Sequence, residues 1–155
     1  MPESLFDELV SLSQSQPVLT TLDQLIAGLR EQRRYHKLFD ARMLRRKAEL
    51  GLPVARPAAL ADVPQEQRKL VEETYIAAAR EVGGLFLADG DIPNAWMYLQ
   101  VIREPETVRQ ALDAIPIPDQ TDETTEQLLR IALFDGVHPP KGLQMMLKLH
   151  GTCST

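Results

Sequence analysis

The chain carries one pattern twice, 46 positions apart: an aliphatic residue, any residue, Leu, any residue, Asp-Gly, any two residues and Pro. The two copies are residues 85–93 and 131–139. Glycine after an apolar run ends a helix, because glycine adopts the left-handed conformation without a Cβ penalty. Proline three residues later is tolerated in the first turn of a new helix, where no backbone donor is needed. Each copy therefore predicts a helix, a tight corner and a second helix.

The spacing of apolar residues predicts further helices in the first third of the chain. A short helix is expected over residues 4–11, and a longer one from a cap at Thr20 or Thr21. The apolar stripe of this second helix loses its phase near Gln32–Arg34 and resumes at Tyr35. Either a tight hairpin or one long helix with two differently facing halves explains the break. We favour the hairpin, because helices much longer than about 25 residues are uncommon in small domains.

Glycine and proline also delimit the middle of the chain. Gly51 is expected to end a helix, and residues 51–61 form an irregular, proline-bearing connection whose apolar residues should pack against the protein. Asp62 then resembles the first residue of a capping box. The helix that follows contains Gly83 and Gly84, which cost about 2 kcal/mol relative to alanine. We therefore expect them to permit the close approach of another helix.

The remaining segments predict shorter helices. A helix from Pro93 to about Arg103 is apolar nearly all round, so it is expected to be the most buried. Another helix restarts after Glu104-Pro105, residues 116–118 form an extended break, and Thr121 or Asp122 caps the next helix. Pro139-Pro140 opens the last helix, which Gly151 closes. No window alternates as a strand does. The expected fold is all-α, an irregular array of stacked antiparallel helical hairpins or a compact bundle, with seven or eight helices in one domain over residues 1–155.

Residues 79–107 resemble a tetratricopeptide repeat. The matching positions are the small and bulky residues that interlock two helices, together with the turn glycine: Val82-Gly83, Phe86, Gly90, Ile92, Ala95 and Leu99. Pro105 lies two residues before the usual proline of the repeat. The copy around Gly136 and the hairpin over residues 25–43 match less well, and the second has Arg33 where glycine is usual. The resemblance implies a helical-repeat protein that contacts other proteins through a concave face.

Composition limits the classes of function. The net charge of −5 argues against a dedicated nucleic-acid binder, and no apolar run approaches the ~18 residues of a membrane span. The first eight residues are acidic, where a secretory signal needs a basic segment. The single cysteine, Cys153, fits a reducing compartment. We therefore expect a cytoplasmic protein without a membrane segment.

Positive charge is concentrated between Arg30 and Glu49. This segment holds eight basic and three acidic residues, so it carries +5 and the rest of the chain −10. Arg33, Arg34, Arg45 and Arg46 are the predicted contacts for a protein partner, which the charge suggests is acidic. The alternatives are phosphate binding, a solvated face, or pairing with the acidic residues 113–126 of the same chain.

Several residues invite a catalytic or metal-binding interpretation. His138, His150, Cys153 and Asp135 are the conceivable zinc ligands, but the paired Cys-x-x-Cys of a structural site is absent. Asp89, Asp91 and Asp135 could perform acid–base chemistry, yet turn formation and helix capping explain them more simply. Trp96, Met97 and Tyr98 could line a pocket, although their spacing favours the core. We therefore predict no catalytic residues, no metal and no cofactor.

The sequence thus favours a non-enzymatic helical-repeat module for protein–protein interaction. The alternative is a helical-bundle enzyme or a ligand- or metal-binding domain that uses the Trp96/Tyr98 helix with His138 and His150. The last helix has more apolar residues than one face needs. That excess predicts either a longer helical-repeat protein, of which this chain is the front part, or a homodimer formed through the C-terminal helix.

Overall fold

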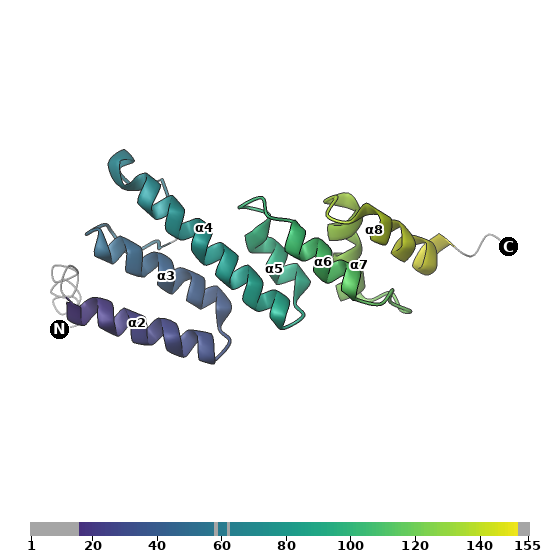
Figure 1. Cartoon of the computed structure of the whole chain (residues 1–155), viewed down its shortest axis with the longest axis horizontal. Helices are drawn as coiled ribbons and strands as arrows, with labels where there is room; N and C mark the ends of the chain where they lie inside the picture. The colour runs from purple at the N-terminus through teal and green to yellow at the C-terminus, as the bar shows by residue number, and fades with distance from the viewer. Residues whose placement is uncertain (1–15, 58, 62, 152–155) are drawn as a thin grey trace. The chain divides into compact units, whose positions relative to one another are not determined.

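The computed structural model describes residues 16–57, 59–61 and 63–151, and within them the chain is helical without strands (Figure 1). The all-α prediction is confirmed. The predicted helix over residues 4–11 and the capping residue Asp62 lie outside the described residues. The α-helices are α2 (Gln16–Glu31), α3 (Tyr35–Glu49), α4 (Gln65–Ala88), α5 (Ile92–Leu99), α6 (Glu106–Ala114), α7 (Glu123–Leu129) and α8 (Pro139–Met146). Two π-helical turns, η1 (Arg130–Phe134) and η2 (Leu147–Gly151), extend α7 and α8.

The chain divides into two compact units, Met1–Val82 and Gly83–Thr155. The division falls inside α4 and not in the irregular connection over residues 51–61. Each unit has its own buried residues. The prediction of a single domain over residues 1–155 stays a prediction.

In the first unit, α2 and α3 form the predicted hairpin and lie side by side (Figure 1). The turn is a Schellman motif, in which Arg34 N donates to Leu29 O at 2.9 Å and Arg33 N donates to Arg30 O at 3.1 Å. Arg33 has φ +58°, so an arginine occupies the left-handed position that usually takes glycine. The predicted cap at Thr20 or Thr21 is wrong, because α2 begins at Gln16 and both threonines lie inside it.

The core of this unit lies between α3 and the first part of α4. Leu38 and Met43 of α3 are fully buried, as are Val71 and Ala78 of α4. The rings of Phe39 and Tyr75 meet edge to face with their centroids 5.1 Å apart, a favourable aromatic geometry.

A buried lysine holds the connection between α3 and α4. Lys47 is only 2% exposed, and its Nζ donates to the carbonyl oxygens of Arg56, at 2.7 Å, and Ala59. Leu52 and Val63, near the two ends of the connection, are buried. The expectation that this irregular segment packs against the protein is therefore confirmed. The role of Lys47 has no counterpart in the sequence analysis.

The second unit begins with the last residues of α4 and the first Asp-Gly corner. Gly90 has φ +79°, and Asp91 N donates to Phe86 O at 2.8 Å, which closes a second Schellman motif. An added Cβ on Gly83 would lie 2.6 Å from Leu99 Cγ, so Gly83 permits the close approach of α5, as predicted. Gly84 has open space around it and does not share this role.

Helix α5 departs from its prediction in length and burial. It ends at Leu99, four residues early, and Arg103 takes the left-handed conformation at φ +57° while Glu104 N bonds Leu99 O. Only three of its residues are buried, whereas Met97 is 54% exposed. The expectation that this helix is the most buried is wrong, because apolar content does not reveal which face is left open.

The second Asp-Gly corner joins η1 to α8. Gly136 has φ +75°, and His138 N donates to Ala132 O at 3.0 Å. Gly142 lies against the backbone of Leu133, where a Cβ would stand 2.9 Å from the amide nitrogen. Asp122 caps α7, because its side chain accepts a hydrogen bond from Thr125 N at 2.7 Å. The cap is therefore Asp122 and not Thr121, the other predicted residue. Both helix–corner–helix predictions are confirmed.

Candidate interaction surfaces

The four predicted contact arginines occupy two separate places on α3 and its preceding turn. Arg33 and Arg34 stand at the α2–α3 turn, and both are exposed. Arg45 and Arg46 lie eleven residues further along, which is about 16 Å at the helical rise per residue. The structure does not bring all four guanidinium groups into one patch.

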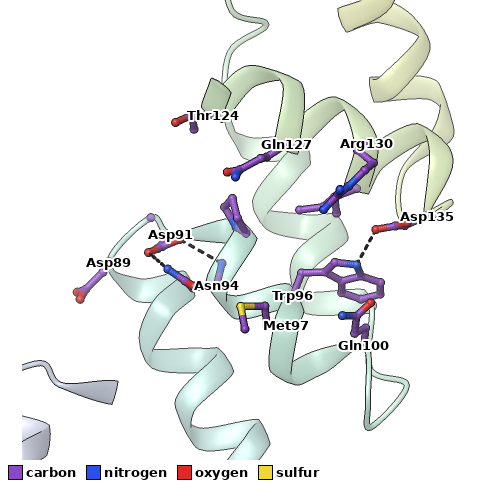
Figure 2. A pocket seen from close by; sticks show the side chains of 13 residues that line it. Asp89, Asp91, Asn94, Trp96, Met97, Gln100, Thr124, Gln127, Arg130 and Asp135 are labelled. Carbon is purple, nitrogen blue, oxygen red and sulfur yellow. Dashed lines mark hydrogen bonds between the residues drawn. The ribbon is translucent and has the colours of Figure 1, made fainter. Parts of the chain in front are cut away.

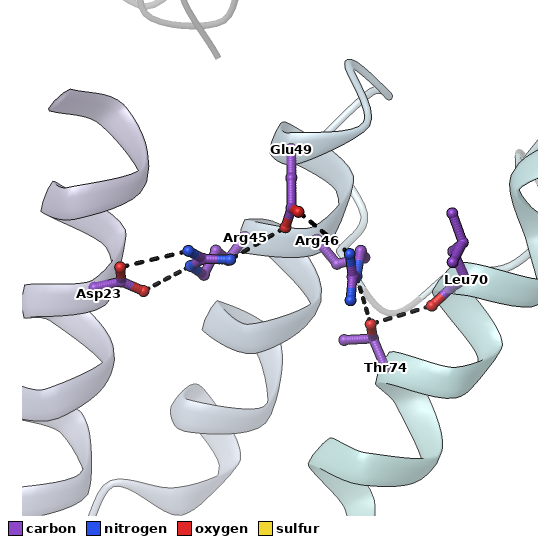
Figure 3. Close-up of polar contacts among 6 residues, drawn as sticks. All are labelled: Asp23, Arg45, Arg46, Glu49, Leu70 and Thr74. Atoms are coloured by element: carbon purple, nitrogen blue, oxygen red, sulfur yellow. Dashed lines mark hydrogen bonds and ion pairs between the residues drawn. The ribbon is translucent and has the colours of Figure 1, made fainter. Parts of the chain in front are cut away.

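Arg45 and Arg46 are held by partners in their own unit (Figure 3). Arg45 Nε donates to Asp23 Oδ1 at 2.6 Å, and its Nη1 donates to Glu49 Oε2 at 3.1 Å. The hydrogen bond with Asp23 raises the pKa of Arg45 above its ordinary value. Arg46 Nε donates to Thr74 Oγ1 at 2.7 Å. These contacts tie α3 to α2 and α4, so both side chains have a structural role besides any partner.

Two further charged pairs of the basic segment join residues of the first unit. Arg30 and Arg42 both approach Glu81, at 2.9 Å and 3.6 Å. The acidic residues 113–126 instead pair within the second unit, with Asp119 at 2.5 Å from Lys148 Nζ and Glu126 at 3.5 Å from His150. Each of these pairs therefore joins residues of one unit.

The histidines proposed as metal ligands make separate contacts. His138 caps α8 by accepting from Lys141 N through Nδ1, at 3.4 Å, which leaves the proton on Nε2 to donate to Asp113 Oδ1 at 3.1 Å. Among the residues that the structure describes, no group of three His, Cys, Asp or Glu side chains could hold a metal ion. Cys153 lies outside those residues.

A groove of about 770 Å³ opens in the second unit beside Trp96 (Figure 2). Two rows of side chains at helical i, i+3 spacing face it. One row runs along α5 and its caps, and the other along α7 into η1: Asp91, Asn94, Met97 and Gln100; Thr124, Gln127 and Arg130. Such spacing places each row on one face of its helix. The groove is completed by Asp89, Gly90, Pro93, Trp96, Ile131 and Asp135.

Hydrogen bonds fix several groups of the groove. Trp96 Nε1 donates to Asp135 Oδ2 at 2.9 Å, which links α5 to the second Asp-Gly corner. Asp91 accepts from Asn94 through both carboxylate oxygens, from N at 3.2 Å and from Nδ2 at 2.7 Å. The indole and both carboxylates are therefore held in place before any ligand arrives.

Tyr98, the other aromatic residue proposed for a pocket, does not line the groove. Its ring stacks on Phe86 with centroids 6.1 Å apart. Trp96 thus takes the surface role and Tyr98 the packing role. The two rows that wall the groove were not predicted, although residues 91, 94, 97 and 100 and residues 124, 127 and 130 follow the i, i+3 spacing of a helix face.

The outer face of α8 and η2 exposes apolar side chains. Leu143 is 51% exposed and Leu147, one turn later, is 59% exposed. The last helix therefore has apolar side chains on its exposed face, in line with its excess of apolar residues in the sequence.

Comparison of the chain with protein-family models, curated proteins and solved structures finds no match. No helix of the described residues is long and apolar enough to cross a membrane. The function of the chain must be inferred from its own residues, because no matching protein supplies it.

Proposed function

We propose that this chain is a non-enzymatic protein–protein interaction module that binds an extended peptide segment in the groove between α5 and α7. The observation that carries the proposal is the groove itself, with Trp96 and the exposed Met97 set among amide side chains. Apolar anchors surrounded by polar groups are typical of protein interfaces.

The polar character of the groove favours a peptide over a small molecule. Eight of its thirteen lining residues are polar or charged, whereas small-molecule sites are lined predominantly by apolar side chains. An extended peptide carries unpaired backbone donors and acceptors. Asn94, Gln100 and Gln127 each offer both a donor and an acceptor to such a backbone. The resemblance of residues 79–107 to a tetratricopeptide repeat supports the same class of function.

A displayed random-peptide selection on the immobilised chain, followed by calorimetry of the selected peptides, tests the proposal. Met97→Glu should weaken binding at least tenfold, because it puts a charge where the apolar anchor sits. Val101→Glu is the matched control, since Val101 is similarly exposed but does not line the groove. Equal binding by M97E and the unaltered chain, or a selection without binders, would contradict the proposal.

The second candidate is a ligand-binding domain or enzyme built around Trp96. The observation that favours it is that Trp96 lines the groove. The other residues of that hypothesis, Tyr98, His138 and His150, do not line it. Native mass spectrometry and elemental analysis of the purified chain distinguish the candidates. A stoichiometric small molecule or metal would favour the second.

The finer expectations about partners are part of the proposal. Arg33 and Arg34, exposed at the α2–α3 turn, remain the predicted contacts for an acidic partner. Arg45 and Arg46, about three turns further along α3, are held by salt bridges and hydrogen bonds. We also propose a homodimer through the C-terminal helix. Leu143→Glu combined with Leu147→Glu should then turn a dimer into a monomer in light scattering, and a monomeric unaltered chain would contradict it. The single cysteine fits a reducing compartment, so we place the module in the cytoplasm.

A further inference from the structure

The ionisable groups that line the groove are unequal in sign. Asp89, Asp91 and Asp135 face a single cation, Arg130, so the lining carries a formal charge of −2. Charged surfaces that bind are arranged to meet the opposite charge, which suppresses wrong partners and speeds encounter. The groove therefore discriminates against an acidic segment.

The negative charge is concentrated at one end of the groove. Asp89 and Asp91 flank Gly90 at the start of α5, and Gln100 marks the other end of this wall. Gln100 follows Asp91 by nine positions, which is about 14 Å at the helical rise. An extended chain advances about 3.3 Å per residue, so this wall matches roughly four residues of a peptide.

The carboxylates of Asp91 and Asp135 keep the capacity to accept more hydrogen bonds. Asp135 uses Oδ2 for Trp96, and each oxygen of Asp91 accepts one bond from Asn94. A carboxylate offers about four lone-pair sites, so a guanidinium or ammonium can still be accommodated. The indole of Trp96 adds an aromatic group of the kind that attracts cations, especially the planar guanidinium of arginine.

We propose, on the basis of the function proposed above, that the groove selects an extended peptide of about four residues carrying a basic side chain, whose charge meets Asp89 and Asp91. Arg130 on the facing wall repels a second cation and leaves room for a neutral or acidic residue at that point. The groove thus binds a basic partner, whereas the partner expected at Arg33 and Arg34 is acidic.

Fluorescence anisotropy with three synthetic heptapeptide pools, randomised except for a central Arg, Gln or Glu, tests the inference. At low salt the Arg pool should bind at least tenfold more tightly than the Glu pool, and added salt should reduce that ratio. Asp89→Asn combined with Asp91→Asn should abolish the preference, because asparagine can still cap α5 while the charge is lost. Asp119→Asn removes an exposed carboxylate outside the groove and should leave the preference intact.

The outcomes separate this inference from the proposed function. If the Gln or Glu pool binds as tightly as the Arg pool, and Met97→Glu weakens all pools, the charge selection is wrong while peptide binding in the groove stands. If no pool binds the unaltered chain, the proposed function is overturned as well. If D119N abolishes the preference as D89N/D91N does, the selection arises from overall charge and the inference is again wrong.

Discussion

The adjacent glycines of α4 give a prediction in which neighbouring substitutions have opposite effects. Replacing either glycine by alanine inside a helix contributes about 1 kcal/mol of helix propensity. Gly84→Ala meets open space, so the free energy of unfolding should rise by about 0.5–1 kcal/mol. Gly83→Ala would place its Cβ 2.6 Å from Leu99 Cγ and 2.8 Å from Leu99 Cδ2.

Whether Gly83→Ala raises or lowers the free energy of unfolding depends on whether the side chain of Leu99 can move. Leu99 is only 2% exposed, so its branched end has no open space to enter. Overpacking in such a core costs about 1–3 kcal/mol, which exceeds the propensity gain. Gly83→Ala should therefore destabilise the chain by up to about 2 kcal/mol.

Urea unfolding followed by the fluorescence of Trp96, the only tryptophan, measures both variants in the second unit. Because the propensity term is common to both, the difference between G83A and G84A isolates the contact with Leu99. In a Leu99→Ala background, Gly83→Ala should lose part of its destabilising effect, because the contact with the leucine side chain is gone. Equal stability of the two single variants would refute the close packing of α4 against α5.

Three further predictions concern turns, a buried charge and acid stability. Arg33→Gly should raise the free energy of unfolding by about 0.5–1 kcal/mol, because arginine at φ +58° carries a strain that glycine lacks. Gly51→Ala, at φ +70°, should lower it, and thermal melts measure both variants. Lys47→Met should cost about 2 kcal/mol in urea unfolding, because two carbonyls of the irregular connection lose the donor that the buried ammonium supplies, whereas the exposed Lys37→Met should be neutral. The backbone hydrogen bond from Thr125 lowers the pKa of Asp122, so its stabilisation is present at neutral pH and lost as pH falls through and below the ordinary aspartate range. Asp122→Asn should therefore flatten the fall in melting temperature between pH 5 and 3, and an unchanged slope would contradict the role of the cap.

Much of the helical architecture follows from local sequence chemistry. The phase break near Gln32–Arg34 predicts the α2–α3 hairpin because an apolar stripe must face one neighbour. The Asp-Gly corners at Gly90 and Gly136 are predictable because left-handed backbone strongly favours glycine. Arg33 shows the limit of this logic, since the same turn forms with an arginine and no glycine signal marks it.

The groove and its walls depend on tertiary placement and could be predicted only in part. Trp96 and Tyr98 both stood as pocket candidates, but only the packing of α5 against α7 and the corner after η1 decides that Trp96 meets Asp135 while Tyr98 meets Phe86. The arginine segment was visible as charge, yet its partners Asp23 and Thr74 come from other helices. Local periodicity carries no information about such partners.

The buried lysines have a consequence for chemical labelling. Lys47 donates to the connection before α4, and Lys141 donates to Ile115 O beside the proline-rich break before α7. An amine that is buried and hydrogen-bonded cannot be reached by acylating reagents without local opening. Acetic anhydride should therefore modify the exposed Lys37 and Lys69 within seconds, while slow acetylation of Lys47 and Lys141 would time the opening of the two connections in the native protein.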